Sequence, residues 1–505
     1  MVTKLETQGK QIFQWGEKFV DIATLEKAVY EAVLSLGRNI MRQCIEEADR
    51  TLARQRDRGM YRDKGYRPTT LKTVMGEVGY QRHVYPVSYT HLTLPSDVYK
   101  RQLLSGAAEQ PRATVYLLDR SMGLDTVGPF SDTVCMMAVE AACAVSHRTA
   151  AATLNDLTGL SLSHESVWRI VQNAGSWEQA RVDSLAAAAK AECGSGTYET
   201  PVLYEEMDGV YLALQGKDRL EHGPSKEMKV SIAYSGIYED ASGRRSLANK
   251  VSYASMEQAE HFRRHAEGVV ADFYAVDCVK RRVFNSDGGT WLQRNMVPGC
   301  TYQLDLFHRN RAVRTCVNDP DLQETILELF HARKVKEAIA VVEASIESTL
   351  DPDEQEKRRK LFTYFNNYRK SLIPYYQRSG RKPPLPNEGQ QPARCGSMES
   401  NIFTIIGNRM KHNRTCWSVA GANNLAALLA LHRTGHLRRV LRDWTAHGAP
   451  SKLYTITAPI SAKQTNKQMS EIYIPPHLLS AGDLHPAAKY CLTKFFPLSE
   501  MHTTE

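Results

Sequence analysis

The stretch VLYEEMDGVYLAL, residues 202–214, decides the fold of the central part of the chain. Valine, tyrosine and leucine dominate it, and such residues favour a β-strand over a helix. Asp208 lies within this otherwise apolar run. A carboxyl group in an apolar strand costs desolvation free energy unless a cation or a partner meets it. The stretch therefore predicts a strand that carries an acid with a specific role.

The pattern on either side of this strand predicts an α/β domain. Residues 227–238, 250–254, 282–286 and 301–307 are β-rich, and residues 256–271 have a helical pattern. Three early strands, a helix and further strands indicate a mixed sheet over residues 197–308. Residues 309–392 are mostly helical in pattern and end in a stretch with proline and glycine. Residues 393–449 carry helices at 397–411 and 420–437, and residues 450–505 form an irregular tail.

The N-terminal region, residues 1–130, has a different character. Apolar residues at helical spacing predict a long amphipathic helix over residues 25–54, and the alternation in residues 73–85 predicts a β-hairpin or ribbon. The segment PVSYTHLTLPSDVYKRQ, residues 86–102, fits neither pattern. It resembles the translation of a sequencing adapter, and a genuine polar loop is the alternative. An adapter predicts poorly defined structure between residues 85 and 115 and no function there.

Residues 131–180 have the pattern of a helix-turn-helix. Helices are expected at residues 132–145, 146–157 and 163–174, with Ser146 as an N-cap and a turn containing Gly159. A plain helical hairpin is the alternative interpretation. If the motif binds DNA, the side chains suited to contact bases or phosphates are polar or basic, namely Arg148, His164, Arg169 and Gln172.

Composition narrows the class of protein. The 505 residues carry a net charge of +8, which favours a polyanionic partner but is a weak signal. No run approaches the roughly 20 apolar residues that span a bilayer, and the N-terminus lacks an apolar signal core. We therefore expect no membrane partner and a cytoplasmic location. The ten cysteines form no CxxC pair, which argues against a zinc ribbon or a disulfide scaffold.

Two further acids are candidates to act with Asp208. Asp287 follows a predicted strand end, and Glu399 opens a predicted helix after Ser397, a plausible N-cap. Each has an ordinary explanation, because Asp-Gly forms turns and acids favour the first turn of a helix. A strand acid, a strand-end acid and a helix acid can nevertheless converge at one sheet edge. Three carboxylates there would coordinate Mg²⁺ or Mn²⁺, which take oxygen ligands.

A basic stretch follows Glu399 in the sequence. Arg409, Lys411 and Arg414 precede Trp417 and are candidates for DNA contacts. Trp417 has two interpretations, a core residue or a ring that stacks on a flipped or terminal base.

Four motifs carry a family resemblance. They are VLYEEMDGVYLALQGKDR (202–219), FNSDGGTWL (284–292), YQLDLFHRNRAV (302–313) and CGSMESNIFTIIGNRMKHNRTCWSVAGANNLAALL (395–429). They resemble bacterial insertion-sequence transposases of the ISLre type, relatives of the Mutator-like members of the DDE superfamily. The resemblance spans residues 25–437 and departs from the family pattern at residues 86–102.

The resemblance implies an RNase H-like catalytic fold with an all-helical insertion, residues 309–392, before the final acid. Asp208, Asp287 and Glu399 match the catalytic triad, and Asp305 and His308 match accessory positions. The expected function is a DNA transposase that cuts and joins element ends with two Mg²⁺ or Mn²⁺ ions. Its expected partners are double-stranded DNA, as terminal repeats and target, and further copies of the chain. A non-catalytic DNA-binding protein derived from a transposase and a related RNase H-like nuclease are the alternatives.

Overall fold

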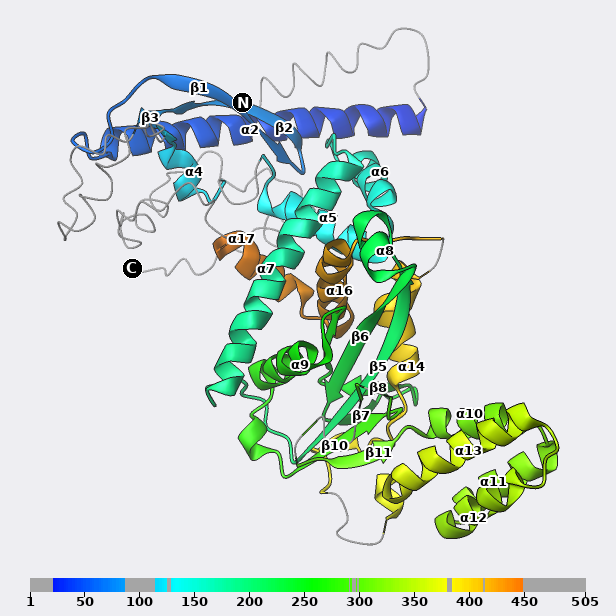
Figure 1. The fold of residues 1–505 in the computed structure, drawn as a ribbon. Coiled ribbons are helices and arrows are strands. Elements are labelled where there is room, and N and C mark those ends of the chain that lie inside the picture. Colours follow the sequence, from blue (N-terminus) through cyan, green and yellow to red (C-terminus); the bar gives the residue numbers. More distant parts are fainter. Residues whose placement is uncertain are drawn as a thin grey trace, which may run out of the picture. The chain divides into compact units, whose positions relative to one another are not determined.

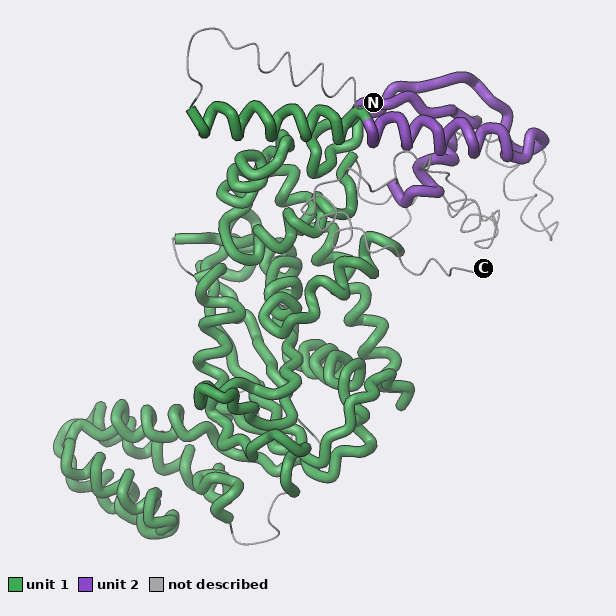
Figure 2. Tube along the Cα trace, turned by 180° about the vertical axis from the view of Figure 1, so that it is seen from behind, with its two compact units in different colours: residues 1–39, 70–78, 126–449 green, residues 40–69, 79–125, 450–505 purple. Residues whose placement is uncertain are grey.

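The structure is a computed structural model of the chain, and it describes residues 21–86, 114–124, 129–289, 291–292, 297, 299–378, 384–411 and 414–447. The chain divides into two compact units (Figure 2). Unit 1 comprises Met1–Asn39, Thr70–Val78 and Thr126–Ala449, and unit 2 comprises Ile40–Thr69, Gly79–Asp125 and Pro450–Glu505.

The N-terminal helix and hairpin expected from the sequence are present. Helix α2 spans Ile22–Gln55, and strands β1 (Tyr66–Thr73) and β2 (Gly76–His83) form a two-stranded sheet. The hairpin begins earlier than the predicted residue 73, since β1 starts at Tyr66 and includes Pro68. Both strands of a two-stranded sheet are edges, where a proline removes no required hydrogen bond.

Unit 2 has a small core of its own. It buries Tyr61, Tyr85, Val115 and Leu117. Strand β3 (Tyr85–Pro86) pairs antiparallel with β4 (Thr114–Val115), and the short helix α4 (Leu117–Ser121) follows. The adapter-like segment lies outside the described residues from position 87 onward.

A five-stranded mixed sheet forms the centre of unit 1, as the sequence predicted (Figure 1). Its order is β11-β10-β5-β6-β9, with bounds Thr301–Leu304, Arg281–Ser286, Val202–Ala213, Ser225–Tyr234 and Val251–Ser255. β5, β6 and β9 run antiparallel in succession, whereas β10 and β11 are parallel to β5. The central strand, β5, is the stretch that contains Asp208.

Two strands differ from their predicted bounds. The stretch 227–238 is broken at Ser235, and its second half becomes β7 (Gly236–Glu239) in a separate sheet with β8 (Arg245–Ala248) and β12 (Gln390–Gln391). The stretch 301–307 ends as a strand at Leu304. Asp305 then caps helix α10 (Leu306–Cys316), because its Oδ1 accepts the His308 N–H at 3.0 Å.

Helices cover both faces of the sheet. Tyr204, Val210 and Leu212 of β5 lie in one core with helices α5 (Asp132–Ala144), α6 (His147–Leu157), α7 (His164–Lys190) and α16 (Val419–Thr434). Met207 points to the opposite face and lies in a second core with Phe262 of helix α9 (Ala259–Phe273). This alternation buries apolar side chains on both faces of β5, which drives unit 1 to fold around that strand.

The three helices predicted for residues 131–180 are confirmed, and one is longer than expected. Ser131, Ser146 and Ser163 cap α5, α6 and α7, and each side chain accepts a backbone N–H. Helix α7 continues to Lys190, beyond its predicted end at residue 174. Gly175 lets α7 pack closely on α16, because a Cβ there would lie 2.5 Å from Asn424 Cβ.

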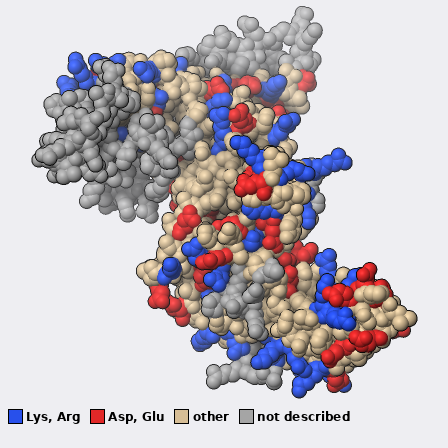
Figure 3. Space-filling model, viewed as in Figure 1, with Lys and Arg blue, Asp and Glu red and all other residues tan. Residues whose placement is uncertain are grey.

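Residues 306–377 are helical, as the pattern indicated. Helices α11 (Pro320–His331), α12 (Val335–Ile346) and α13 (Pro352–Asn367) follow α10, with short 3₁₀ turns at Arg369–Ser371 and Tyr375–Gln377. On the face shown in Figure 3, basic and acidic side chains alternate over these helices. That face therefore has no continuous basic track.

The C-terminal described part is a series of helices. Helix α14 (Met398–Ile402) runs through a π-helical turn (Phe403–Gly407) into α15 (Asn408–Met410). Helix α16 ends at Gly435, and α17 spans Leu437–His447. Among the described helices, none combines the length and apolar character required to cross a membrane. The nine cysteines in the described part of the chain form no disulfide with one another.

Candidate active site

The three candidate acids line one cleft in unit 1, although they come from distant parts of the sequence. Asp208 lies on β5, Asp287 directly follows β10, and Glu399 lies in the first turn of α14. Asp305 and His308 line the same cleft, whose volume is about 100 Å³. Asn285 pairs with Glu206 across the parallel strands, so Asp287 and Asp208 each lie two residues beyond that pair.

Asp208, His308 and Glu399 form the closest group. One ligand atom of each lies within 4.8 Å of the others, and His308 Nε2 lies 3.6 Å from Asp208 Oδ2. The neighbouring carboxylate of Asp208 raises the pKa of His308, and burial opposes that rise. Asp208 Oδ1 also accepts the Gly209 N–H at 2.7 Å. The carboxylate of Asp208 is thus oriented from two sides.

Asp287 is held by its own turn and by helix α13. Its Oδ1 accepts the Gly289 N–H at 2.8 Å, while Tyr364 and Tyr368 donate hydroxyl hydrogen bonds to the carbonyls of residues 287 and 288 at 2.6 and 2.9 Å. Burial raises the pKa of Asp287, and the charge of Asp208 raises it further. A cation in the cleft would offset both effects.

Glu399 has an exposed side chain, and its helix begins differently from the prediction. Ser397 precedes α14, but its side chain makes no capping hydrogen bond. Its backbone is already helical, with φ −87° and ψ −4°, whereas a capping side chain needs an extended backbone. The backbone N–H groups of Gly396 and Ser397 instead donate to buried Glu206.

The donor set of the cleft fits a hard divalent cation. Asp208 and Glu399 offer carboxylate oxygens beside the His308 imidazole, and Asp287 adds a carboxylate in the same cleft. Oxygen ligands suit both Mg²⁺ and Mn²⁺, and an imidazole among the ligands favours Mn²⁺ over Mg²⁺. Asp305 is less available, because its oxygens accept hydrogen bonds from the His308 N–H and from Asn285 Nδ2 at 3.0 Å each.

The predicted DNA-contacting residues of α6 and α7 lie away from the residues that line this cleft. Arg148, His164 and Arg169 have exposed side chains, and Arg169 pairs with Glu165 at 2.6 Å. Gln172 has a packing role, since its Oε1 accepts a hydrogen bond from Asn424 Nδ2 at 2.7 Å. Three of these four side chains are therefore accessible to a nucleic acid.

The basic stretch after Glu399 divides into buried and exposed residues. Arg409 Nε donates to the Ala142 carbonyl at 2.8 Å, and its guanidinium lies over the Trp417 ring. Burial lowers the pKa of Arg409. Trp417 Nε1 donates to the Met410 carbonyl at 2.9 Å. Arg409 and Trp417 thus help hold this region together, whereas Lys411 and Arg414 are exposed.

Several residues at the site were not found from the sequence. Tyr364 of α13 and Tyr368, directly after that helix, hold the Asp287 turn, and Phe307, 52% exposed, lines the cleft beside His308. Glu206 contacts the segment that carries Glu399. The one feature of the sequence that pointed to Phe307 was its position between two candidate site residues, Asp305 and His308. The tyrosines have helical spacing but nothing in their sequence indicates a site.

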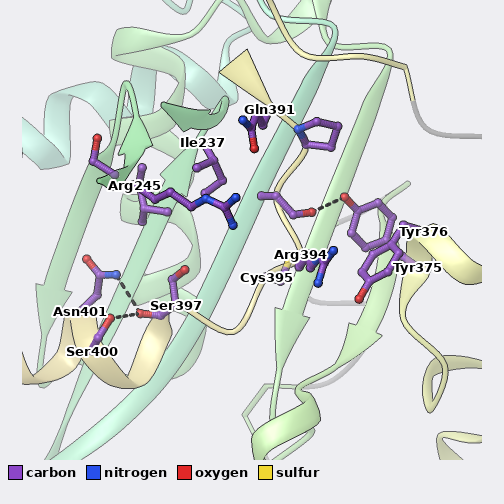
Figure 4. Close-up of a pocket in the computed structure, with 14 residues that line it drawn as sticks. Ile237, Arg245, Tyr375, Tyr376, Gln391, Arg394, Cys395, Ser397, Ser400 and Asn401 are labelled. Atoms are coloured by element: carbon purple, nitrogen blue, oxygen red, sulfur yellow. Dashed lines mark hydrogen bonds between the residues drawn. The ribbon is translucent and has the colours of Figure 1, made fainter. Parts of the chain in front are cut away.

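A second, larger cavity of about 790 Å³ adjoins the same segment (Figure 4). Arg245, Arg394 and Tyr376 line it, together with Cys395, Ser397 and Ser400. Gly396, Met398 and Glu399 line the acid cleft instead. Residues 395–400 therefore separate the two cavities.

Comparison with known proteins places the chain in a family. The model of an uncharacterised protein family, UPF0236, matches residues 16–446. A protein of Streptococcus gallolyticus, named "UPF0236 protein in vanSb 3'region", is 22% identical over 432 residues, which cover 82% of this chain and 83% of that protein. The matched region includes both the mixed sheet and every residue of the acid cleft. The chain belongs to the uncharacterised protein family UPF0236.

Proposed function

We propose that this protein is a DNA transposase that cuts and joins the ends of an insertion element by metal-dependent phosphoryl transfer. The observation that carries the proposal is the convergence of Asp208, Asp287 and Glu399 on one cleft beside His308. Acids on a strand, after a neighbouring strand and on a distant helix have no shared structural reason to meet. A common cation provides one.

The sheet supports an RNase H-like catalytic domain. That fold has an antiparallel three-stranded meander, with further parallel strands on the other side of the first strand. Strands β5, β6 and β9 form such a meander, and β10 and β11 continue from β5 in parallel. Helices α10–α13 lie in sequence between the second and third acids, where the proposed insertion belongs.

In the proposed mechanism the chain's residues hold and orient the reacting groups. Two divalent ions bound in the cleft would activate the attacking oxygen and stabilise the leaving oxygen. Asp208, Asp287 and Glu399 would hold the ions, His308 orients the Asp208 carboxylate, and Tyr364 and Tyr368 fix the turn of Asp287. The exposed ring of Phe307 offers a stacking surface for an unpaired base at the mouth of the cleft.

In this proposal, exposed basic side chains make the DNA contacts away from the cleft. Arg148, His164, Arg169, Lys411 and Arg414 are accessible for phosphate contacts, which position a duplex without reading its sequence. Joining two element ends requires that both be held together, so we propose a homo-oligomer acting on chromosomal DNA in the cytoplasm.

An in vitro cleavage and joining assay tests the proposal. The substrate is a duplex carrying the sequences that flank the gene, with Mg²⁺ or Mn²⁺ added. We expect nicked and joined products from the wild-type chain and neither product from Asp208→Asn, Asp287→Asn or Glu399→Gln, with end binding retained. Glu221→Gln, in an exposed acidic group on helix α8 (Gly216–His222), is the control and retains activity.

The other outcomes separate the alternatives. Cutting without joining would identify an RNase H-like nuclease. Binding to the ends without metal-dependent cutting would identify a DNA-binding protein that has no catalytic role. Full cutting and joining by all three acid variants would remove the assigned residues from the reaction.

A further inference from the structure

A row of buried polar side chains crosses the three parallel strands beneath the acid cleft. Glu206 on β5, Asn285 on β10 and Gln303 on β11 are neighbours in the strand register. They are at most 1% exposed. Asn285 Nδ2 donates to Glu206 Oε2 at 2.9 Å, and Gln303 Nε2 donates to Asn285 Oδ1 at 3.3 Å. Apolar side chains here would have avoided the cost of burying polar groups.

Every hydrogen bond described for the Glu206 side chain is one that its carboxyl group accepts. Tyr234 donates its hydroxyl to Oε1 at 2.6 Å. The Gly396 N–H donates to Oε2 at 2.7 Å, and the Ser397 N–H donates to Oε2 at 3.1 Å. With Asn285 also donating, both oxygens are engaged. Glu206 is therefore poorly placed to bind a metal itself, although it lies two positions from Asp208.

The two backbone donors belong to the turn that directly precedes Glu399. Gly396 has a left-handed φ of +87°, and α14 begins at Met398. The same row also reaches the other side of the cleft, because Asn285 Nδ2 donates to Asp305, which caps the helix of His308. One buried carboxyl group thus fixes the start of α14 to the strand that carries Asp208.

We infer that Glu206 is a positioning residue that holds the Gly396–Ser397 turn and thereby sets Glu399 against Asp208 and His308. This inference rests on the metal site of the proposed function. Outer hydrogen bonds that orient metal ligands typically contribute about 10–100-fold in metal affinity. The Ser397 carbonyl accepts hydrogen bonds from Ser400 and Asn401, but these lie within the start of α14 itself. The side-chain hydrogen bonds described from Gly396 and Ser397 to another element are those to Glu206.

A matched pair of substitutions at Ser397 tests the backbone contact. Ser397→Pro removes the N–H that donates to Glu206, and the native φ of −87° is close to that of proline. Ser397→Ala keeps the N–H. We expect calorimetric titration with Mn²⁺ to show an affinity at least ~10-fold weaker for Ser397→Pro, with Ser397→Ala within about twofold of wild type. Equal affinities for the two variants would overturn the inference.

Two substitutions of Glu206 test the carboxyl group. Glu206→Met keeps the volume and removes both acceptors, so we expect Mn²⁺ affinity to fall as in Ser397→Pro. Glu206→Gln retains one oxygen for Asn285 and the turn, while its amide donates to the Tyr234 hydroxyl. It should therefore retain most of the affinity that Glu206→Met loses. A purely space-filling role predicts the reverse order, with Glu206→Met no worse than Glu206→Gln.

A metal-free readout separates this inference from the proposed function. Amide hydrogen exchange is measured on the wild type and Glu206→Met without metal. We expect faster exchange at residues 396–402 in Glu206→Met, with helix α16 unchanged. If the wild type binds no Mn²⁺, the proposed metal site fails, while the exchange result still decides whether Glu206 holds the turn. Unchanged exchange at residues 396–402 would refute the positioning role.

Discussion

Asp208, Asp287 and Glu399 depend on their neighbours in different ways. Asp208 is fixed by the strand itself and by His308. Glu399 depends on the turn that Glu206 holds, and Asp287 depends on a turn held by Tyr364 and Tyr368 at the end of α13. The sequence suggested these acids as candidates through the motifs of the family resemblance, and the structure brings them to one cleft. The sequence did not predict their supports, since these are buried polar side chains whose partners lie far away in the chain.

Gly288 is the residue whose substitution should disturb Asp287 most selectively. Its φ is +75°, and a Cβ there would lie 2.7 Å from the Tyr368 ring. We expect Gly288→Ala to lower the free energy of unfolding by about 1–3 kcal/mol and to weaken Mn²⁺ binding, because the turn must shift. Denaturant unfolding and Mn²⁺ titration measure the two effects.

Gly243→Ala is the matched control for this substitution. Gly243 has a similar φ of +79°, but no heavy atom lies within 4 Å of its added Cβ. It should show the backbone strain without any change in Mn²⁺ affinity. Equal losses of metal affinity in the two variants would contradict the role of the Asp287 turn.

At the scale of elements, much of the fold was predictable from periodicity. The helix at 25–54, the three helices after Ser131 and the strand at 202–214 appear where predicted, although the third of these helices runs on to Lys190. The errors lie where a single residue ends an element. Ser235 breaks one predicted strand, and the Asp305 cap ends another after Leu304. Ser235 hydrogen-bonds to Ala248 and Gln390, which are remote in the chain and which local propensity does not register. The Asp305 cap on His308 is local, and it overrides the strand pattern of the residues before it.

The contact between α7 and α16 gives a prediction at this scale. Alanine is preferred to glycine in a helix by about 1 kcal/mol, so propensity alone predicts that Gly175→Ala stabilises the protein. A Cβ at Gly175 would lie 2.6 Å from Asn424 Cα, however, and the clash with backbone should dominate. We expect a net loss of about 1–3 kcal/mol in unfolding free energy.

Thermal and denaturant unfolding measure that loss. Ser184→Ala, at an exposed position on the same helix, is the control and should stay within about 0.5 kcal/mol of wild type. A stabilised Gly175→Ala would show that the two helices pack less closely than described.

His265 on α9 links that helix to α7 in a pH-dependent manner. Its Nδ1 lies 3.0 Å from Glu257, and its Nε2 lies 3.0 Å from Asp183. The hydrogen bond to Glu257 raises the pKa of His265 above its ordinary value, and burial opposes the rise. A raised folded-state pKa means that protonation stabilises the fold. This contribution is complete below the unfolded pKa of about 6.5 and is lost as the pH rises through the folded value.

We therefore expect the stability advantage of wild type over His265→Gln to be larger at about pH 6 than at about pH 8.5. Denaturant unfolding at the two pH values measures the difference. His261→Gln, exposed on the same helix, is the control and should show a smaller change. An advantage that grows with pH would reverse the sign and contradict the assignment.

At the scale of the whole molecule, the order of the strands explains why distant acids meet. β5 is central, β10 is its parallel neighbour, and α14 packs against β5 through the Glu206 contact. The mixed sheet was predictable from the sequence, whereas the register that aligns Glu206, Asn285 and Gln303 was not, because register depends on pairing between remote strands. The central claim is that this arrangement is a divalent-metal site.

Calorimetric titration with Mn²⁺ tests that claim most directly. The Glu221→Gln variant is compared with the double variant that also carries Asp208→Asn. Glu221→Gln removes a ligand from the exposed group Asp218, Glu221 and His222, so that this group does not bind the ion. We predict that Glu221→Gln binds up to two Mn²⁺ ions per chain at the cleft, and that adding Asp208→Asn weakens this binding by at least ~10-fold without lowering the free energy of unfolding. Identical binding isotherms for the two proteins would contradict the account.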